Sequence, residues 1–165
     1  MRNISRQLNS FIAPVVMCII LPLAIVLSEH HYSLMISSSI LQLLVGLIIS
    51  LTGLILFIIT TSTFIRIGNG TIMPWDPTRT LVVAGAYQYV RNPIILSVII
   101  LLAGEALFFG SYGIALLAIL FFVINSIYFN YSEEPGLEKR FGEEYREYKK
   151  NVSRWIPRWK PWDPV

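Results

Sequence analysis

Residues 36–65 read ISSSILQLLVGLIISLTGLILFIITTSTFI and contain no acid, base or histidine. A helix needs roughly 20 apolar residues to cross the hydrocarbon core of a bilayer. This stretch therefore predicts a membrane span that is longer than required, so that it tilts or protrudes on one side. The same criterion predicts three further spans, at residues 11–28, 94–109 and 114–131. We expect an all-α polytopic membrane protein with four transmembrane helices, built as a single membrane domain over residues 1–165.

Two of these spans depend on their flanking sequence. A signal peptide is the alternative for residues 11–28, because Arg2 and Arg6 precede the apolar stretch. No A-x-A-like cleavage site occurs before Glu29, so we expect a retained span. Only Gly110-Ser111-Tyr112-Gly113 separates the third and fourth spans, which predicts a tight antiparallel helical hairpin.

Composition excludes several classes of protein. The chain is 55% hydrophobic and 14% charged, whereas a soluble domain is typically about 25% charged. The single cysteine, Cys18, cannot form an internal disulfide, and no Cys/His cluster has the spacing of a metal site. The net charge of +3 is compatible with nucleic acid. The bases flank apolar spans, however, so we expect lipid headgroups as their partners, with neither nucleic acid nor metal.

The positions of the bases predict the orientation of the chain. No Lys or Arg occurs between the first and second spans or between the third and fourth. Basic loops are retained on the cytoplasmic side, so both termini and the loop before the third span are predicted to be cytoplasmic. The bases are Arg2 and Arg6; Arg66, Arg79 and Arg91; and Lys139, Arg140, Arg146, Lys149, Lys150, Arg154, Arg158 and Lys160.

Two cytoplasmic segments are then left for chemistry. The first, residues 68–92, contains five glycines and prolines that argue for turns. The second begins at Ser132, and Pro135 suits the first turn of a new helix. Apolar residues then recur at threes and fours, and Gly142 is expected to separate two short amphipathic helices. Residues 154–162 mix indoles with cations, a combination that suits the headgroup layer.

Several polar residues in these regions are candidates for a site, and each also has a structural explanation. Glu105 lies inside the third span, where an acid either contacts a ligand or makes a buried hydrogen bond. Glu133 and Glu134 either begin a solvated helix or hold an ammonium group. Arg91 and Tyr87 are ordinary interfacial residues when taken singly. Together they are predicted to converge at one cytoplasmic membrane face.

Three blocks of sequence carry a resemblance to a known family. They are Gly85-Ala86-Tyr87-Gln88-Tyr89-Val90-Arg91-Asn92-Pro93, then Leu102-Ala103-Gly104-Glu105-Ala106-Leu107, then Glu133-Glu134-Pro135-Gly136-Leu137-Glu138-Lys139-Arg140-Phe141-Gly142-Glu143-Glu144-Tyr145. In order and spacing they resemble the isoprenylcysteine carboxyl methyltransferase family, which is grouped with the phospholipid N-methyltransferases. The resemblance covers residues 74–157. Family members typically show Arg-His-Pro-x-Tyr where this chain has Arg91-Asn92-Pro93-Ile94-Ile95.

The resemblance implies an integral membrane methyltransferase that binds S-adenosylmethionine and methylates a lipid or a small lipophilic acceptor. It implies that Arg91 and Glu134 are catalytic, with Arg91 orienting an anionic acceptor and Glu134 holding the methionine ammonium. The implied cofactor-binding residues are Tyr87, Asn92, Pro93, Gly104, Glu105, Leu107, Glu133, Glu134 and Tyr145. The Asn92 and Ile95 departures bear on a prenylcysteine substrate more than on the cofactor.

Two alternatives remain open at the level of sequence. One is an NADPH-dependent membrane reductase of the sterol-reductase type, whose 2′-phosphate would need basic contacts such as Arg140 and Arg146. The other is a small four-helix transporter with Glu105 as its coupling acid. Binding of S-adenosylmethionine without binding of NADPH would remove the reductase.

Overall fold

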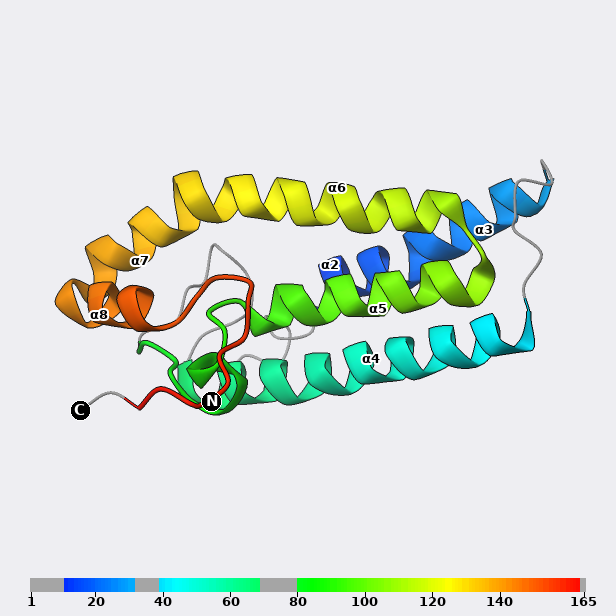
Figure 1. The fold of residues 1–165 in the computed structure, drawn as a ribbon. Helices are drawn as coiled ribbons and strands as arrows, with labels where there is room; N and C mark the ends of the chain where they lie inside the picture. The colour runs from blue at the N-terminus through cyan, green and yellow to red at the C-terminus, as the bar shows by residue number, and fades with distance from the viewer. Residues whose placement is uncertain (1–10, 32–38, 69–79, 164–165) are drawn as a thin grey trace. The chain divides into compact units, whose positions relative to one another are not determined.

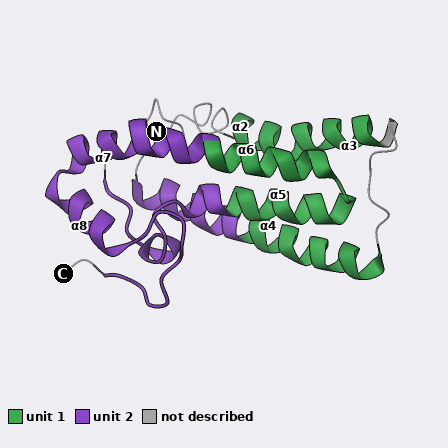
Figure 2. Ribbon diagram, turned by 45° about the horizontal axis from the view of Figure 1, so that its top comes forward, with its two compact units in different colours: residues 1–55, 97–123 green, residues 56–96, 124–165 purple. Residues whose placement is uncertain are grey.

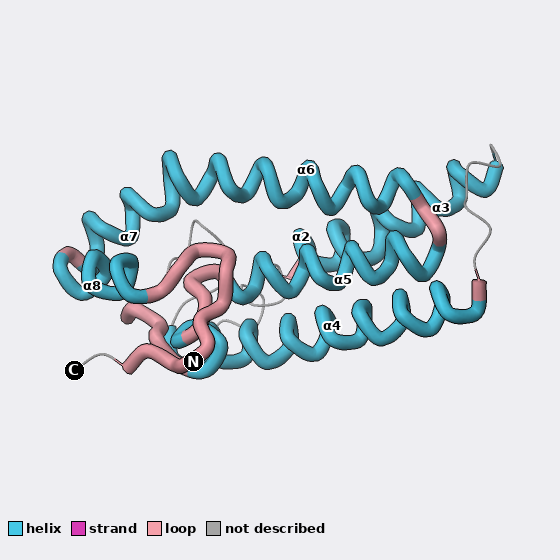
Figure 3. The backbone as a smooth tube through the Cα atoms, in the orientation of Figure 1, coloured by secondary structure: helices cyan, strands magenta, loops and turns pink. Residues whose placement is uncertain are grey.

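The structure is a computed structural model that describes residues 11–31, 39–68 and 80–163. Within these ranges the chain is helical with connecting loops and has no strand, as predicted (Figures 1 and 3). Arg2, Arg6, Arg79 and the predicted start of the second span at residues 36–38 lie outside the described residues. The helices are α2 (Ile12–Val15), α3 (Leu21–His31), α4 (Ile40–Gly68), α5 (Pro93–Phe109), α6 (Tyr112–Tyr128), α7 (Glu134–Phe141) and α8 (Glu143–Asn151).

Three stretches of helix are long and apolar enough to cross a membrane. They are Ile12–Glu29, Ile40–Gly68 and Tyr112–Phe141, while α5 is a shorter apolar helix of 17 residues. Large apolar side chains on these helices are exposed, for example Ile40 at 72% and Ile124 at 62%. Such surfaces are unfavourable in water and are matched by lipid. The chain is therefore an integral membrane protein.

Two of the helical stretches contain a π-helical turn, and each turn ends two residues before a proline. Val16–Ile20 precedes Pro22, and Phe129–Glu133 precedes Pro135. A proline inside a helix lacks its N–H and clashes with the carbonyl four residues earlier. A wider π turn accommodates both effects without breaking the helix. The fourth apolar stretch therefore does not stop at residue 131, as the sequence suggested, but continues through Pro135 to Phe141.

The chain divides into two compact units (Figure 2). Unit 1 comprises Met1–Ile55 and Ser97–Val123, and unit 2 comprises Leu56–Leu96 and Ile124–Val165. In unit 1, α4 and α5 approach at small residues. An added Cβ at Gly46 would lie 2.5 Å from Phe108 N, and one at Gly53 would lie 2.5 Å from Leu101 N. Small residues that admit a neighbouring backbone are a common basis of helix packing in membranes.

Unit 1 also contains the predicted hairpin between α5 and α6. Gly110 has a φ of +61°, which suits a glycine at the turn. Glu29 lies in the last turn of α3 rather than in a loop, since the first helical stretch extends beyond residue 28. Its Oε1 accepts the Gly113 backbone N–H at 2.7 Å, and Glu29 is only 8% exposed. This carboxylate therefore caps the start of α6, where N–H groups lack helical partners.

Unit 2 has its own small core, built on α8. The core contains Tyr145, Tyr148 and Val152, packed against Leu81, Val83, Leu137, Phe141 and Trp162. The threefold and fourfold spacing seen in the sequence therefore does mark the buried face of α8. Gly142 separates α7 from α8 with φ +58° and ψ −128°, a conformation that glycine adopts readily. The predicted break at Gly142 is confirmed.

Candidate functional site

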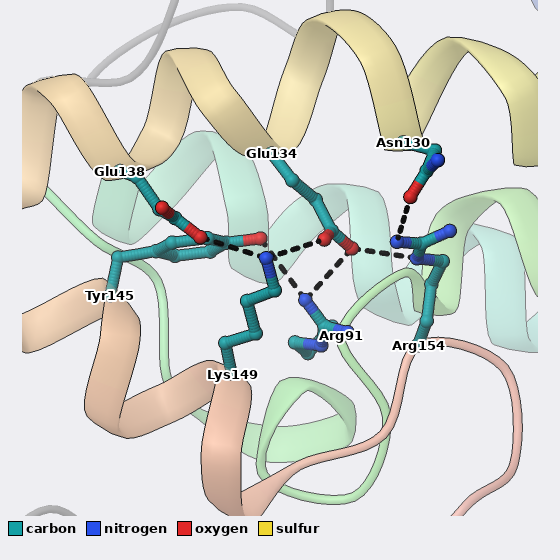
Figure 4. Close-up of polar contacts among 7 residues, drawn as sticks. All are labelled: Arg91, Asn130, Glu134, Glu138, Tyr145, Lys149 and Arg154. Atoms are coloured by element: carbon teal, nitrogen blue, oxygen red, sulfur yellow. Dashed lines mark hydrogen bonds and ion pairs between the residues drawn. The ribbon is translucent and has the colours of Figure 1, made fainter.

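The centre of the polar cluster in unit 2 is the carboxylate of Glu134 (Figure 4). Its Oε1 accepts from Arg91 Nη1 at 2.8 Å and from Arg154 Nε at 2.6 Å. Its Oε2 lies 3.2 Å from Lys149 Nζ. The Glu134 side chain is 3% exposed and that of Arg91 is 9% exposed. Buried charges are stable only when they are paired and hydrogen-bonded, as these are.

The cluster continues outward from this centre. Lys149 Nζ also lies 2.7 Å from Glu138 Oε1, so one ammonium group contacts two carboxylates. Arg154 Nη2 donates to Asn130 Oδ1 at 3.3 Å. Three bases therefore meet two acids, which leaves an excess of positive charge. Figure 4 shows these side chains converging from α7, α8 and the loops on either side.

Tyrosines line the side of the cluster formed by α8. Arg91 Nη1 donates to the Tyr145 hydroxyl at 3.2 Å, and Tyr145 is 2% exposed. Burial, and then the nearby charge of Glu134, raise the pKa of Tyr145. Burial also raises the pKa of Tyr148. The hydrogen bond with Glu138, followed by the one with Glu134, raises the pKa of Lys149. Near neutral pH the tyrosines are thus neutral hydroxyls and Lys149 is a cation.

Backbone pairing fixes the segment that carries Arg91. The Arg91 N–H donates to Ser153 O at 2.9 Å, and the Arg158 N–H donates to Tyr89 O at 3.0 Å. The buried Tyr148 hydroxyl donates to Tyr87 O at 2.6 Å. Two main-chain hydrogen bonds and the Tyr148 hydroxyl therefore tie together segments that are far apart in sequence, and only the main-chain bonds need no particular side chain.

Three buried nitrogens near this pairing have no hydrogen-bond acceptor within the described part of the chain. They are Arg91 Nε, Asn92 Nδ2 and Arg158 Nη1. A buried N–H without a partner costs roughly 1–3 kcal/mol. Such groups in a native protein call for an explanation, and an acceptor supplied by a ligand is one.

The phospholipid methyltransferase family profile matches residues 41–144, more than half of the chain. The chain belongs to the phospholipid methyltransferase family. An uncharacterized protein from Haemophilus influenzae is 37% identical over 62 residues, which are 37% of this chain and 97% of that protein. No solved structure matches.

Membership in the phospholipid methyltransferase family confirms the resemblance seen in the sequence, and it indicates a methyltransferase at this coarse level. The matched residues include Arg91, Asn92 and Glu134. They end before Lys149 and Arg154, the other two bases on Glu134. The cluster is therefore only partly contained in the region that defines the family.

Several residues predicted from the sequence lie together in unit 2. Arg91 is in direct contact with both Glu134 and Tyr145, and Asn92 and Pro93 follow Arg91 at the start of α5. Pro93 is fully buried. The other two predicted residues of unit 2 make their contacts with residues outside the cluster. Tyr87 stacks on Phe64 with 5.9 Å between ring centroids. Glu133 Oε2 accepts a hydrogen bond from Tyr128 Oη at 3.1 Å.

The remaining predicted residues, Gly104, Glu105 and Leu107, lie in unit 1. Gly104 packs on the backbone of Ser50, which an added Cβ would strike. Leu107 is 41% exposed, and its carbonyl accepts from Gln42 Nε2 at 2.9 Å. Glu105 is half-buried, and its Oε2 has no hydrogen-bond partner among the described residues. The close approach of Ser50 gives Gly104 a packing role in unit 1, whereas Glu105 Oε2 has no such explanation.

Lys149, Arg154 and Glu138 were not predicted from the sequence as site residues. Lys149 and Arg154 belong to the long basic series after residue 132, which is typical of a headgroup-facing tail. Their spacing of 15 and 20 residues from Glu134 matches no short motif. A usable signal was the buried face of α8: Lys149 follows directly after Tyr148, so it lies beside that face.

Proposed function

We propose that the protein transfers a methyl group from S-adenosylmethionine to a lipophilic acceptor at the cytoplasmic face of the membrane. The observation that carries this proposal is the Arg91–Glu134 pair, buried and joined at 2.8 Å, within a chain of the phospholipid methyltransferase family. Under this proposal α5 also crosses the membrane, as the third of four spans, and the loop before it and the residues after residue 131 are cytoplasmic. The positions of the bases support that orientation.

The donors and acceptors of the cluster fit the amino-acid end of S-adenosylmethionine. Glu134 Oε2 and Glu138 Oε1 already hold one ammonium, the Nζ of Lys149. We infer that Glu134 and Glu138 would hold the methionine ammonium of the cofactor at this place, and that Lys149, whose side chain is 40% exposed, would move out to solvent. The exchange replaces one cation by another, so it leaves no buried charge unpaired.

The buried nitrogens of Asn92 and Arg91 that have no acceptor fit the negative groups of the cofactor and of the methyl acceptor. Asn92 Nδ2 is a buried donor that would be satisfied by the methionine carboxylate. Arg91 Nε would be satisfied by an anionic oxygen of the acceptor, while Arg91 Nη1 stays on Glu134. Guanidinium groups suit such shared recognition because their donors are fixed in one plane.

The chemistry asked of the protein is chiefly alignment. S-adenosylmethionine, when bound, supplies a sulfonium methyl that is already activated. Glu134 fixes Arg91, and Tyr145 supports the same guanidinium from α8. Rigid placement of donor and acceptor is worth several kcal/mol of the activation barrier. The exposed apolar surfaces of the helices give a lipid acceptor access from the bilayer. Tyr87, Pro93, Gly104, Glu105, Leu107 and Glu133 remain proposed cofactor-binding residues.

A labelled-methyl transfer assay tests the proposal. The purified full chain, reconstituted in nanodiscs made from a total membrane lipid extract, is incubated with S-adenosylmethionine labelled in its methyl group. We expect label in the organic phase, and its loss in Arg91→Gln. The matched control is Arg146→Gln, since Arg146 pairs with the exposed Glu143 outside the cluster. Equal labelling by wild type and Arg91→Gln, or no labelling by wild type, would overturn the proposal.

A further inference from the structure

Residues 153–163, here called the C-terminal loop, form no helix but are held firmly to unit 2. Three backbone hydrogen bonds fix the loop to residues 88–91, and the Ser153 hydroxyl also donates to Ile156 O. The three bonds are Arg91 N to Ser153 O at 2.9 Å, Arg158 N to Tyr89 O at 3.0 Å, and Trp162 N to Gln88 O at 3.1 Å. The loop therefore presents its side chains from a fixed backbone rather than as a free tail.

Between these attachment points the loop exposes two large apolar side chains. Ile156 is 77% exposed and Trp159 is 101% exposed. Pro157 directly follows Ile156, and Pro161 lies two residues after Trp159. A proline fixes its own φ. An aromatic side chain buries roughly 150–250 Å² when it finds an apolar partner. The structure thus holds an indole and a branched aliphatic group outward at little further conformational cost.

The same loop presents positive charge beside its indole. Arg158 and Lys160 flank Trp159 in sequence. Lys160 is exposed, and Arg158 is half-buried. The acid of the loop, Asp163, accepts a hydrogen bond from the Gln88 side-chain amide. The exposed part of the loop is therefore apolar and basic, which matches an apolar layer carrying negative charge.

The loop also lies at the level where an apolar helix begins. Its partners are residues 88–91, and α5 starts at Pro93, two residues later. The segment before an apolar membrane helix lies near the boundary between water and lipid. Indoles concentrate in that layer, and each base near an anionic membrane surface contributes roughly 1 kcal/mol.

We propose that the C-terminal loop is a binding surface for the anionic headgroup layer of the bilayer that surrounds the protein. Ile156 and Trp159 enter the layer, and Arg158 and Lys160 contact lipid phosphates. This binding surface is separate from methyl transfer and stands if the proposed function fails.

Tryptophan fluorescence of the full chain in nanodiscs tests the surface. The emission of Trp159 is obtained as the difference between wild type and Trp159→Phe, a change at a fully exposed site. In nanodiscs containing phosphatidylglycerol brominated near the headgroup, we expect at least a roughly twofold loss of this difference signal, since interfacial indoles lie at that depth. We also expect it to be shielded from acrylamide.

Variants that remove a lysine distinguish attraction of the loop to anionic lipid from insertion of its apolar side chains alone. Lys160→Gln should weaken the quenching in phosphatidylglycerol and leave that in phosphatidylcholine unchanged. The matched control is Lys150→Gln, which removes an exposed lysine from α8 and should change neither. If Lys160→Gln and Lys150→Gln changed the quenching of Trp159 equally, the proposed contact of Lys160 with lipid phosphates would be overturned.

If the C-terminal loop lies in water or binds something other than the headgroup layer, the quenching results differ. A Trp159 signal that acrylamide quenches freely, and that brominated lipid leaves intact, would show a loop in water. A signal shielded from both quenchers would indicate a protein partner or a second copy of the chain. A shift of the Trp159 emission that inorganic phosphate alone produces in phosphatidylcholine nanodiscs would indicate that the loop binds free phosphate. Each of these outcomes overturns the proposal.

Discussion

Arg91 Nη1 donates to Glu134 Oε1 at 2.8 Å, although 43 residues separate the two in sequence. The side chain of Arg91 is 9% exposed and that of Glu134 is 3% exposed. Arg154 and Lys149 complete the shell of cations around the same carboxylate. One buried acid thus joins the segment before α5, the start of α7, the end of α8 and the C-terminal loop.

The first prediction concerns the stability that this acid confers. Glu134→Gln leaves Arg91 buried without a counter-charge, and breaking a buried pair from one side costs roughly 3–5 kcal/mol. Thermal unfolding of the purified protein in detergent should show a markedly lower midpoint. Glu138→Gln is the control, because its pair with Lys149 is more exposed and is worth about 0–1 kcal/mol. Similar midpoints for the two variants would contradict the central position of Glu134.

The second prediction concerns helix packing in unit 1. An added Cβ at Gly53 would lie 2.5 Å from Leu101 N, so Gly53→Ala forces α4 and α5 apart. Overpacking of this kind costs roughly 1–3 kcal/mol. Gly136→Ala is the matched change, since nothing lies within 4 Å of its added Cβ. Alanine favours a helix over glycine by roughly 1 kcal/mol, so Gly136→Ala should raise the unfolding midpoint while Gly53→Ala lowers it.

The third prediction concerns alkaline pH. Burial raises the pKa of Tyr148 above its ordinary value of 10.0, and the pKa of Tyr87 is raised by burial as well. Above pH 10 the unfolded chain loses these protons and the folded chain retains them. The contribution of these two tyrosines to the free energy of unfolding is therefore constant below that pH and falls as the pH rises further.

Tyr148→Phe tests the cause of this fall. The variant removes a titrating group, so its stability should decline less steeply above pH 10 than that of wild type. At neutral pH it should be less stable by roughly 1–3 kcal/mol, because Tyr87 O loses its hydroxyl donor. Tyr131→Phe, at a residue that is 78% exposed, should change neither property. An unchanged slope in Tyr148→Phe would assign the alkaline loss to other groups.

The fourth prediction follows from the ammonium position. If Lys149 Nζ occupies the place of the cofactor ammonium, then Lys149→Met removes an internal competitor. The apparent affinity for S-adenosylmethionine should rise several-fold, since binding no longer has to displace a cation. Lys150→Met, on the same helix, should leave the affinity unchanged. Weaker binding in Lys149→Met would mean that this lysine contacts the cofactor instead.

The sequence predicts much of this structure because apolar runs and glycines act locally. Hydropathy alone locates the long helices, and Gly142 marks the break between α7 and α8. The continuation of α6 into α7 was not predicted, because proline usually suggests a helix start. The π turn at Phe129–Glu133, which absorbs Pro135 inside a continuous helix, leaves no clear mark in the sequence.

The candidate site was predictable only in part, for a related reason. The order of the spans predicted that Arg91, Glu134 and Tyr145 converge at one membrane face, but it did not predict the direct contacts of Arg91 with the other two. Lys149 and Arg154 were not anticipated, because their approach to Glu134 depends on the path of α8 and the C-terminal loop. Gly104 fits the close approach of α4 as well as it fits a ligand, and sequence cannot separate the two.

Equilibrium binding of S-adenosylmethionine to the full chain in nanodiscs tests the central claim most directly. We predict saturable binding that NADPH does not displace, and at least tenfold weaker binding in folded Glu134→Ala, a loss of about 1.4 kcal/mol. Unchanged affinity in folded Glu134→Ala, or saturable binding of NADPH in place of S-adenosylmethionine, would contradict the account.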